Sequence, residues 1–309
     1  MTAPPSCPAA VLRLPVIHDI VIGDFGRDAT IEFLKRVSAG ERDLILEWLD
    51  TDEHPFFDEY RRIMWTVLAD IAEFKRETIA AVAKHGALTT EVLVGVGGST
   101  SVAVEVYERV TEEALARAAF LARRGETAIR VLIPCNRLSD LAEHISARAR
   151  SAEWLAGLRR RHGLDLDLDQ ERAVRSIRVL TVVESVTNVL KRAGCRRALV
   201  LGSAEVRALY ATALGRAGIA CLELNESQQR EVDSSIVLAI EGTSAARTEA
   251  ARRLRSDVIR PVVGPGDDVA IVEACTDFHL GVGIDSLDVF ARDAVMDAYS
   301  PNSVRCSER

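Results

Sequence analysis

The sequence reads VLIPCN at residues 131–136 and VAIVEACTD at residues 269–277. In each stretch an apolar run of strand length delivers one cysteine, Cys135 or Cys275, and a small polar residue follows at once. Short apolar runs of this kind are typical of buried strands in parallel sheets. Because ligands bind outside the carboxyl ends of such strands, we expect both thiols to face a ligand crevice rather than the core.

Strand-like and helix-like segments alternate on both sides of these stretches. A strand is expected at residues 16–23, a glycine turn follows it, and further pairs of strands and helices extend to residue 162. The same plan returns from residue 177 to residue 299. This alternation predicts an α/β protein whose parallel sheets are covered by helices on both faces. Residues 41–85 carry helical periodicity, and we expect one or two helices there.

Length and charge narrow the class of protein. With 309 residues the chain can bury a sizeable core in two domains of ordinary size. Its formal net charge of −7 argues against nucleic acid as a partner, because phosphate binding needs a basic surface. No apolar run approaches the roughly 18 to 20 residues of a membrane span. No secretory signal is recognisable, so a cytoplasmic location is the default expectation, and the six cysteines are expected to be thiols.

Two opposed thiols suit the removal of a proton from one face of a carbon and the return of a proton to its other face. One cysteine acts as a thiolate base and the other as an acid. With each sulfur about 3 to 3.5 Å from the reacting carbon, the sulfurs lie roughly 7 Å apart. The alternative is that both are ordinary buried cysteines. The remaining cysteines are expected to be core or tail residues outside the site; they are Cys7, Cys195, Cys221 and Cys306.

Several of these motifs resemble one family. IPCN at residues 133–136 and CTD at residues 275–277 resemble the two cysteine motifs of the aspartate/glutamate racemase superfamily, usually I-P-C-N-T and G-C-T-E. GDFGRDAT at residues 23–30 is similar to the G-G-M-G-P-x-A-T loop of the aspartate racemase branch. LGS at residues 201–203, followed by Tyr210, looks like the L-G-T…Y segment of that family. The resemblance covers most of the chain, although residues 38–90 look longer than in compact members.

The resemblance implies two flavodoxin-like domains, related by pseudo-symmetry, with the active site in the cleft between them. Residues 1–152 and 286–309 would form the N-terminal domain, and residues 153–285 the C-terminal domain. It also implies an enzyme that uses neither a metal nor pyridoxal phosphate (PLP), with Cys135 and Cys275 as the acid/base pair. The substrate would be a small carboxylate or amino acid. Four residues would hold its carboxylate and amino groups: Asn136, Thr276, Thr30 and Ser203.

Two positions depart from the family pattern and join the candidate substrate-binding residues. Arg137 stands where a threonine is expected, and Asp277 stands where a glutamate is expected. Arg137 could bind a second carboxylate bidentately, could stabilise a thiolate, or could point to solvent. His279, four residues after Cys275, could tune that thiol or could be structural. No pair of histidines has a spacing suited to a metal ion.

Racemisation or epimerisation of an amino acid is the leading hypothesis. The runner-up is cis–trans isomerisation of an unsaturated diacid such as maleate, in which one cysteine adds to the double bond. A decarboxylase fits less well, because that branch resembles a one-cysteine site. A ligand-binding protein that kept the fold without the chemistry is a further alternative, because function lives in the site and not in the fold. In each case the expected partner is a small molecule, and a homodimer is a possible assembly.

Overall fold

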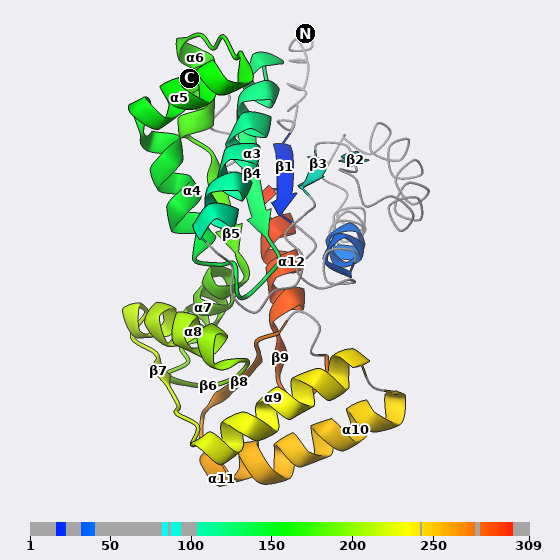
Figure 1. Ribbon diagram of the computed structural model, residues 1–309. Helices are drawn as coiled ribbons and strands as arrows, with labels where there is room; N and C mark the ends of the chain where they lie inside the picture. Colours follow the sequence, from blue (N-terminus) through cyan, green and yellow to red (C-terminus); the bar gives the residue numbers. More distant parts are fainter. Residues whose placement is uncertain are drawn as a thin grey trace, which may run out of the picture.

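The computed structural model describes residues 17–22, 32–40, 82–85, 88–93, 104–241, 243–275 and 279–298. These residues form two sheets that follow one another along the length of the molecule, each with helices packed against it (Figure 1). The described strand pairs are parallel except for the pair at one edge of the first sheet. The α/β class expected from the sequence is therefore confirmed.

The first sheet has five strands in the order β2-β3-β1-β4-β5. They are β1 (Ile17–Ile22), β2 (Val82–His85), β3 (Leu88–Leu93), β4 (Ala128–Ile133) and β5 (Arg178–Thr181). The prediction of helices over residues 41–85 is wrong at residues 82–85. These residues form β2, which pairs antiparallel with β3. Pairing at a sheet edge overrides a local helical pattern. The preceding part of that region, residues 41–81, lies outside the described residues.

The second sheet has four parallel strands in the order β7-β6-β8-β9. They are β6 (Arg197–Leu201), β7 (Ala220–Cys221), β8 (Ala270–Glu273) and β9 (Ile284–Asp285). The two central strands, β6 and β8, are the apolar runs that the sequence predicted. The expected strand at residues 219–224 is reduced to the two residues of β7, at the edge of the sheet.

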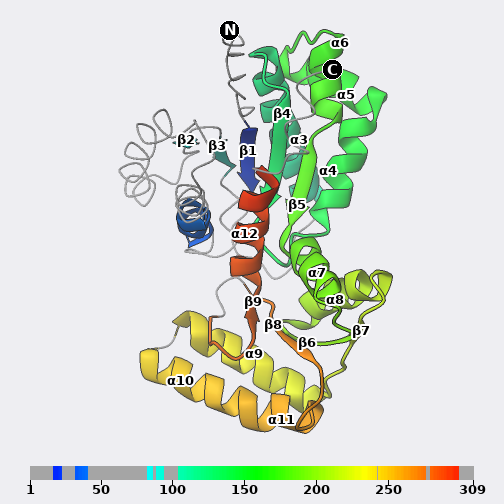
Figure 2. The ribbon, with the colours of Figure 1, turned by 180° about the vertical axis from the view of Figure 1, so that it is seen from behind.

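Helices cover both sheets from two sides, as Figures 1 and 2 show from opposite directions. Those of the first half are α3 (Val104–Arg123), α4 (Leu141–Arg150), α5 (Ala152–His162) and α6 (Leu168–Arg175), together with a helix that includes residues 32–40. Next come α7 (Val182–Arg192), α8 (Ala204–Arg216), α9 (Glu226–Glu241), α10 (Ser244–Arg253), the π-helical turn η1 (Leu254–Ile259), α11 (Arg260–Val262) and α12 (Ser286–Ala298). No helix in the described ranges is long and apolar enough to cross a bilayer.

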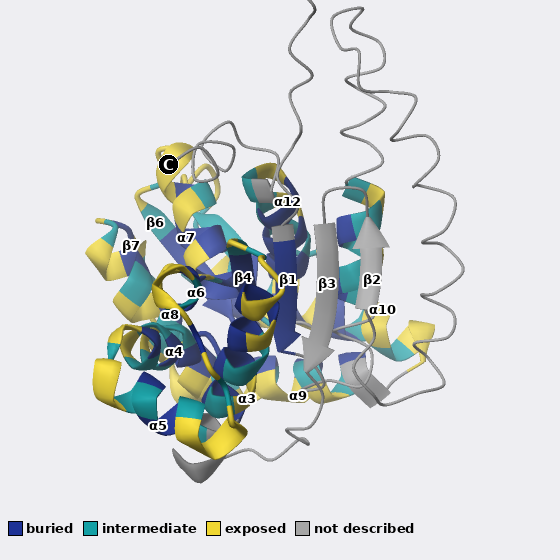
Figure 3. Ribbon diagram, turned by 90° about the horizontal axis from the view of Figure 1, so that it is seen from above, coloured by how far each residue is buried: buried dark blue, intermediate teal, exposed yellow. Residues whose placement is uncertain are grey.

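The strands are buried on both faces because alternate residues enter different cores. In β1, Ile20 and Ile22 pack against the core formed with α3 to α6, whereas Val21 faces α7 and α12. Seen from above, β1 and β4 lie in the buried interior, and exposed residues appear on the surrounding helices (Figure 3). Runs such as residues 131–133 are therefore continuously apolar, which made them recognisable as parallel strands.

One core runs through both halves of the molecule. It contains Val21 and Leu132 from the first sheet, Val200 and Val272 from the second, and Phe290 from α12. Two further cores lie on the outer faces, one between the first sheet and α3 to α6, the other between the second sheet and the helices from α9 to η1. The shared core means that the two halves are packed together rather than joined by a linker.

Residues 152–181 belong with the first sheet, although the sequence placed them in the second domain. β5 pairs parallel with β4, and side chains of α5 and α6 pack in the outer core of the first half. A strand pattern shows that a strand exists but not which sheet it joins, so the boundary expected at residue 152 moves toward residue 181. From the sequence, residues 164–169 are expected to form a polar connection; the last two of them instead begin α6, whose capping box is formed by Asp167 and Gln170.

A buried arginine ties the end of α12 to the first sheet. Arg130 on β4 is 3% exposed and forms two hydrogen bonds with the carboxylate of Asp19 on β1, at 2.6 and 2.7 Å. It also donates to the carbonyl of Ala294 at 2.8 Å and to the carboxylate of Asp297 at 2.9 Å. Removing one partner of such a buried pair costs about 3 to 5 kcal/mol, so this contact fixes α12 firmly.

Candidate active site

Cys135 follows β4, an interior strand of the first sheet, after a single proline. The residue is 9% exposed and packs at the margin of the core formed with α3 to α6. The hydroxyl of Ser139 donates a hydrogen bond of 3.2 Å to the carbonyl of Cys135 and so fixes the turn into α4. The sequence correctly predicted that this cysteine stands at the carboxyl end of a parallel strand.

Cys275 follows β8, an interior strand of the second sheet, after a single alanine. It is partly buried and packs against the core between the second sheet and α9. The four cysteines of the described ranges form no disulfide; they are Cys135, Cys195, Cys221 and Cys275. Each half therefore carries one candidate thiol at the end of an interior strand.

Gly202 sits where β6 and β8 end side by side. A Cβ atom at this position would lie 3.0 Å from the carbonyl oxygen of Ala274, the residue before Cys275. The Ala274 N–H donates to the carbonyl of Leu201 at 2.9 Å, which holds the two strand ends together. Ser203 then caps α8 by accepting the N–H of Val206 at 3.4 Å. Ser203 thus lies beside the Cys275 segment, and its hydroxyl oxygen serves the helix.

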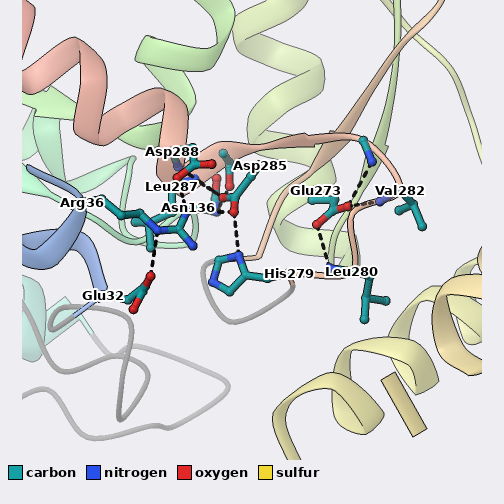
Figure 4. Close-up of polar contacts among 12 residues, drawn as sticks. Glu32, Arg36, Asn136, Glu273, His279, Leu280, Val282, Asp285, Leu287 and Asp288 are labelled. Atoms are coloured by element: carbon teal, nitrogen blue, oxygen red, sulfur yellow. Dashed lines mark hydrogen bonds and ion pairs between the residues drawn. The ribbon is translucent and has the colours of Figure 1, made fainter. Parts of the chain in front are cut away.

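The loop after Cys275 is held by a buried carboxylate. Glu273, at the end of β8, is 1% exposed and accepts the backbone N–H groups of Leu280 and Gly283 at 3.0 Å each, as well as that of Val282. Figure 4 shows this carboxylate between the two limbs of the loop. Three backbone donors satisfy the buried charge. Glu273 therefore closes the loop that leads away from Cys275.

Asn136 is predicted to contact the substrate. Its amide nitrogen and its amide oxygen each already form a hydrogen bond within the protein. The residue is 2% exposed; its Nδ2 donates to the hydroxyl of Ser286 at 3.1 Å, and its Oδ1 accepts the hydroxyl of Tyr210 at 2.7 Å. Tyr210 is fully buried in α8, and burial raises the pKa of its phenol well above the usual range. The side chain of Asn136 thus ties the Cys135 segment to α8 and α12.

Arg137 directly follows Asn136 and is half-buried. Hydrogen bonds from the backbone N–H of Glu205 and from Ser203 lower the pKa of Glu205, and the positive charge of Arg137 adds to the effect. Arg137 and Ser203, two of the predicted substrate-binding residues, therefore both act on the carboxylate of Glu205. Three other predicted residues lie outside the described residues; they are Thr30, Thr276 and Asp277.

A charged cluster lies beside the start of α12 (Figure 4). Asp285 accepts a hydrogen bond from Arg36 at 2.8 Å, and its Oδ2 lies 2.8 Å from Nδ1 of His279. Arg36 also binds Glu32 and Asp288, at 3.1 and 2.7 Å. The hydrogen bond to Asp285 raises the pKa of His279. Burial alone would raise the pKa of Asp285, but hydrogen bonds from His279 and Arg36 outweigh it and hold that pKa well below its usual value.

These contacts bring the two cysteine segments to one junction. Asn136, next to Cys135, binds Ser286, the residue after Asp285; Asp285 in turn binds His279, on the loop that follows Cys275. The start of α12 therefore lies between the two segments. Each segment carries one thiol, and two-sided proton transfer requires one acid/base group on each face of the reacting carbon.

A separate cavity of about 810 Å³ opens between α4, α7 and α8. Neither cysteine lines it, although Ser139, whose hydroxyl holds the Cys135 carbonyl, does. Its rim carries the ion pair between Arg216 and Glu143, at 3.2 Å. Within the described ranges, no group of three histidine, cysteine, aspartate or glutamate residues could hold a metal ion.

The polar residues that organise this junction were largely missed from the sequence. In the sequence, Glu273 is a single charged residue within an apolar strand, and Arg36 is one of several charged residues on a predicted helix. Neither pattern indicates a site. The signal for Asp285 was stronger, because a carboxylate directly before a helix is a common N-cap. No local pattern reveals that Glu273 accepts donors seven to ten residues further along the chain.

No protein-family model and no curated protein matches the chain, but solved structures do. A candidate Asp/Glu racemase from Yersinia pestis matches with a TM-score of 0.52 at 13% identity, over 92% of this chain and 100% of that chain. An aspartate racemase homologue from Pyrococcus horikoshii matches over the same shares at 13% identity, with a TM-score of 0.47. Arylmalonate decarboxylase matches at 16% identity over 93% of this chain and 94% of that chain, with a TM-score of 0.39. Only the first match has a TM-score above 0.5, and it shows that the chain shares the fold of that candidate Asp/Glu racemase.

Proposed function

We propose that the chain is a PLP-independent racemase or epimerase of a small carboxylate substrate, an amino acid related to aspartate or glutamate. Cys135 and Cys275 form its acid/base pair. The observation that carries the proposal is their placement, because each follows the carboxyl end of an interior strand, one in each sheet. The match of the fold to a candidate Asp/Glu racemase supports the same function.

In the proposed reaction, one cysteine as thiolate takes the proton from the α-carbon, and the opposite thiol gives its proton to the other face. The product has inverted configuration, the first sulfur ends as a thiol, and the second ends as a thiolate. Protons and charge therefore balance without a co-reactant. The reverse reaction uses the same groups in exchanged roles, so the enzyme would work in both directions.

Substrate binding in this proposal draws on both halves. Arg137 offers a guanidinium that can hold a carboxylate bidentately, and a substrate oxygen would compete with Glu205 for the hydroxyl hydrogen of Ser203. Asn136 keeps one amide hydrogen beyond the one given to Ser286. Thr30, Thr276 and Asp277 complete the proposed set.

The proposal can be tested in deuterated water with a panel of amino acids, hydroxy acids and unsaturated diacids. NMR would follow loss of the α-proton, and a chiral separation would follow inversion. We expect exchange with inversion for at least one amino acid. Cys135→Ser and Cys275→Ser should each abolish inversion, whereas Cys195→Ser, a matched change in the shared core, should retain it.

Other outcomes would replace the proposal. Conversion of maleate to its trans isomer without α-proton exchange would identify a cis–trans isomerase. A thermal shift with a carboxylate, without reaction across the panel, would identify a binding protein. Full inversion by either active-site variant would remove that cysteine from the mechanism.

A further inference from the structure

Asp285 is the residue at which several parts of the proposed site meet. It ends β9 directly before α12, and its side chain is 20% exposed. Its Oδ1 accepts the backbone N–H groups of Leu287 and Asp288 at 2.9 and 3.2 Å, and so caps α12. One oxygen of the carboxylate therefore serves the helix, which leaves the second oxygen for other contacts.

The second oxygen, Oδ2, joins two segments that are distant in sequence. It accepts Arg36, from the helix at residues 32–40, at 2.8 Å. It also lies 2.8 Å from Nδ1 of His279, on the loop after Cys275. Neither contact contributes to the cap. The residue after Asp285 is Ser286, which binds Asn136 beside Cys135.

We propose that Asp285 is a positioning residue of the cysteine site, which holds the Cys275 loop, the helix at residues 32–40 and the Cys135 segment in one arrangement. The inference rests on the proposed function, because it assigns Asp285 to the same site. Asp285 itself touches no reacting atom in this proposal. It acts through His279, Arg36 and the start of α12.

The charges around the pair explain why Asp285 is suited to this role. Arg36 and Glu32 face it from the helix at residues 32–40, Asp288 from α12, and Glu273 from β8. His279 is held through Nδ1, so its Nε2 is the nitrogen turned away from Asp285; a carboxylate in this position fixes the orientation of the ring. The raised pKa of His279 and the lowered pKa of Asp285 agree with an ion pair at neutral pH.

Asp285→Asn separates positioning from folding. Asparagine is as good an N-cap as aspartate, so its carbonyl oxygen can keep the contacts with Leu287 and Asp288. Its amide NH₂ then replaces Oδ2 and faces two donors, Arg36 and His279. Asp288→Asn is the matched control, because among the described contacts the side chain of Asp288 binds Arg36, whereas His279 binds Asp285 and not Asp288.

We expect Asp285→Asn to keep a melting temperature close to that of the wild type. The pKa of His279, followed by NMR, should fall toward 6.5, its ordinary value. The rate at which iodoacetamide modifies Cys275, mapped by mass spectrometry, should change severalfold. With a substrate in hand, kcat should fall by about 10- to 100-fold, with a smaller change in KM. Asp288→Asn should have much smaller effects on all of these.

The proposal is overturned if Asp285→Asn matches Asp288→Asn in the His279 pKa, in Cys275 modification and in kcat. If Asp285→Asn fails to fold, Arg36→Gln and His279→Gln remove the partners of Oδ2 one at a time, and unchanged Cys275 modification in both would overturn it equally. If the wild type shows no inversion of any substrate, the proposed function fails. The NMR and modification readouts still decide the positioning role.

Discussion

The hydroxyl of Tyr210 donates a hydrogen bond of 2.7 Å to the amide oxygen of Asn136, and both residues are buried. Tyr210 belongs to α8 of the second half, whereas Asn136 follows Cys135 in the first. This single contact therefore crosses the junction of the two halves at the residue next to a candidate catalytic thiol.

Tyr210→Phe should destabilise the protein by about 1 to 3 kcal/mol, because it leaves the amide oxygen of Asn136 buried without its donor. Urea unfolding would measure the change. The control is Thr212→Val in the same helix, whose exposed hydroxyl binds only the carbonyl of Ala208 in the described contacts; it should change the stability by less than about 0.5 kcal/mol. Equal losses of unfolding free energy in the two variants would show that the buried hydrogen bond contributes no more to stability than the exposed one.

Gly202→Ala should disturb the Cys275 segment, since the added methyl group would meet the Ala274 carbonyl at 3.0 Å. We expect a loss of about 1 to 3 kcal/mol from overpacking and lower activity. Gly215→Ala is the control within α8, where nothing lies within 4 Å of the added carbon. It should stabilise the protein by roughly 0.5 to 1 kcal/mol through helix propensity. In thermal unfolding, Gly202→Ala should lower the melting temperature and Gly215→Ala should raise it.

Glu273→Gln should loosen the loop from residue 275 to residue 283. Glutamine can still accept with one oxygen, but its NH₂ group would face a backbone N–H. The cost of the unsatisfied buried donors is about 1 to 3 kcal/mol. Hydrogen exchange at Leu280, Val282 and Gly283 should accelerate in the variant. Unchanged protection of these amides would mean that the loop is held by other contacts.

The cysteines should differ in their rates of alkylation. Cys275 is partly buried and Cys135 is 9% exposed, so Cys275 should react with iodoacetamide first. Cys221 should lag as well, because burial raises the pKa of its thiol and lowers its thiolate fraction. Peptide mapping over time at pH 7.5 would give the order. Modification of Cys221 before Cys275 would contradict this prediction.

The pair of His279 and Asp285 should make stability depend on pH. The pKa of His279 is raised above 6.5 in the folded protein, and that of Asp285 lies below 3.8. Stabilisation is therefore complete between about pH 4 and about pH 6.5. It is lost as the pH rises through the folded-state pKa of His279, and also as the pH falls through that of Asp285.

The measurement for this pair is urea unfolding of the wild type and of His279→Gln at a series of pH values. The wild type should gain at most about 1 kcal/mol over the variant near pH 5 to 6, because the pair is partly exposed to solvent. The difference should shrink above neutrality. A difference that increases from pH 6 to pH 9 would refute the assignment of the charge pair.

Much of the fold could be predicted from the sequence because the central strands are continuous apolar runs. β4 and β8 were recognised in this way, together with the cysteine that follows each. Sheet membership could not be predicted, since pairing of β5 with β4 depends on how the chain returns and not on the residues of β5. The short helix α10 was missed because its alanine and arginine residues show no clear apolar stripe.

The positions of the two cysteines at strand ends could be predicted, whereas the contacts that hold their segments could not. Asn136, which stays a predicted substrate-binding residue, has its amide joined to Tyr210 and Ser286, which lie 74 and 150 residues further along the chain. Such partners meet only after the two sheets have packed. A motif locates a chemical group, whereas long-range packing decides which of its atoms are already engaged.

The path of the chain through α12 has a practical consequence. This helix begins at the end of the second sheet, and its far end is tied to Arg130 in the first. The second sheet is therefore an insertion within the first unit, not an appendage to it. The first half therefore cannot be produced as a contiguous fragment; in isolation it would require excision of roughly residues 182–285 and a designed link from β5 to α12.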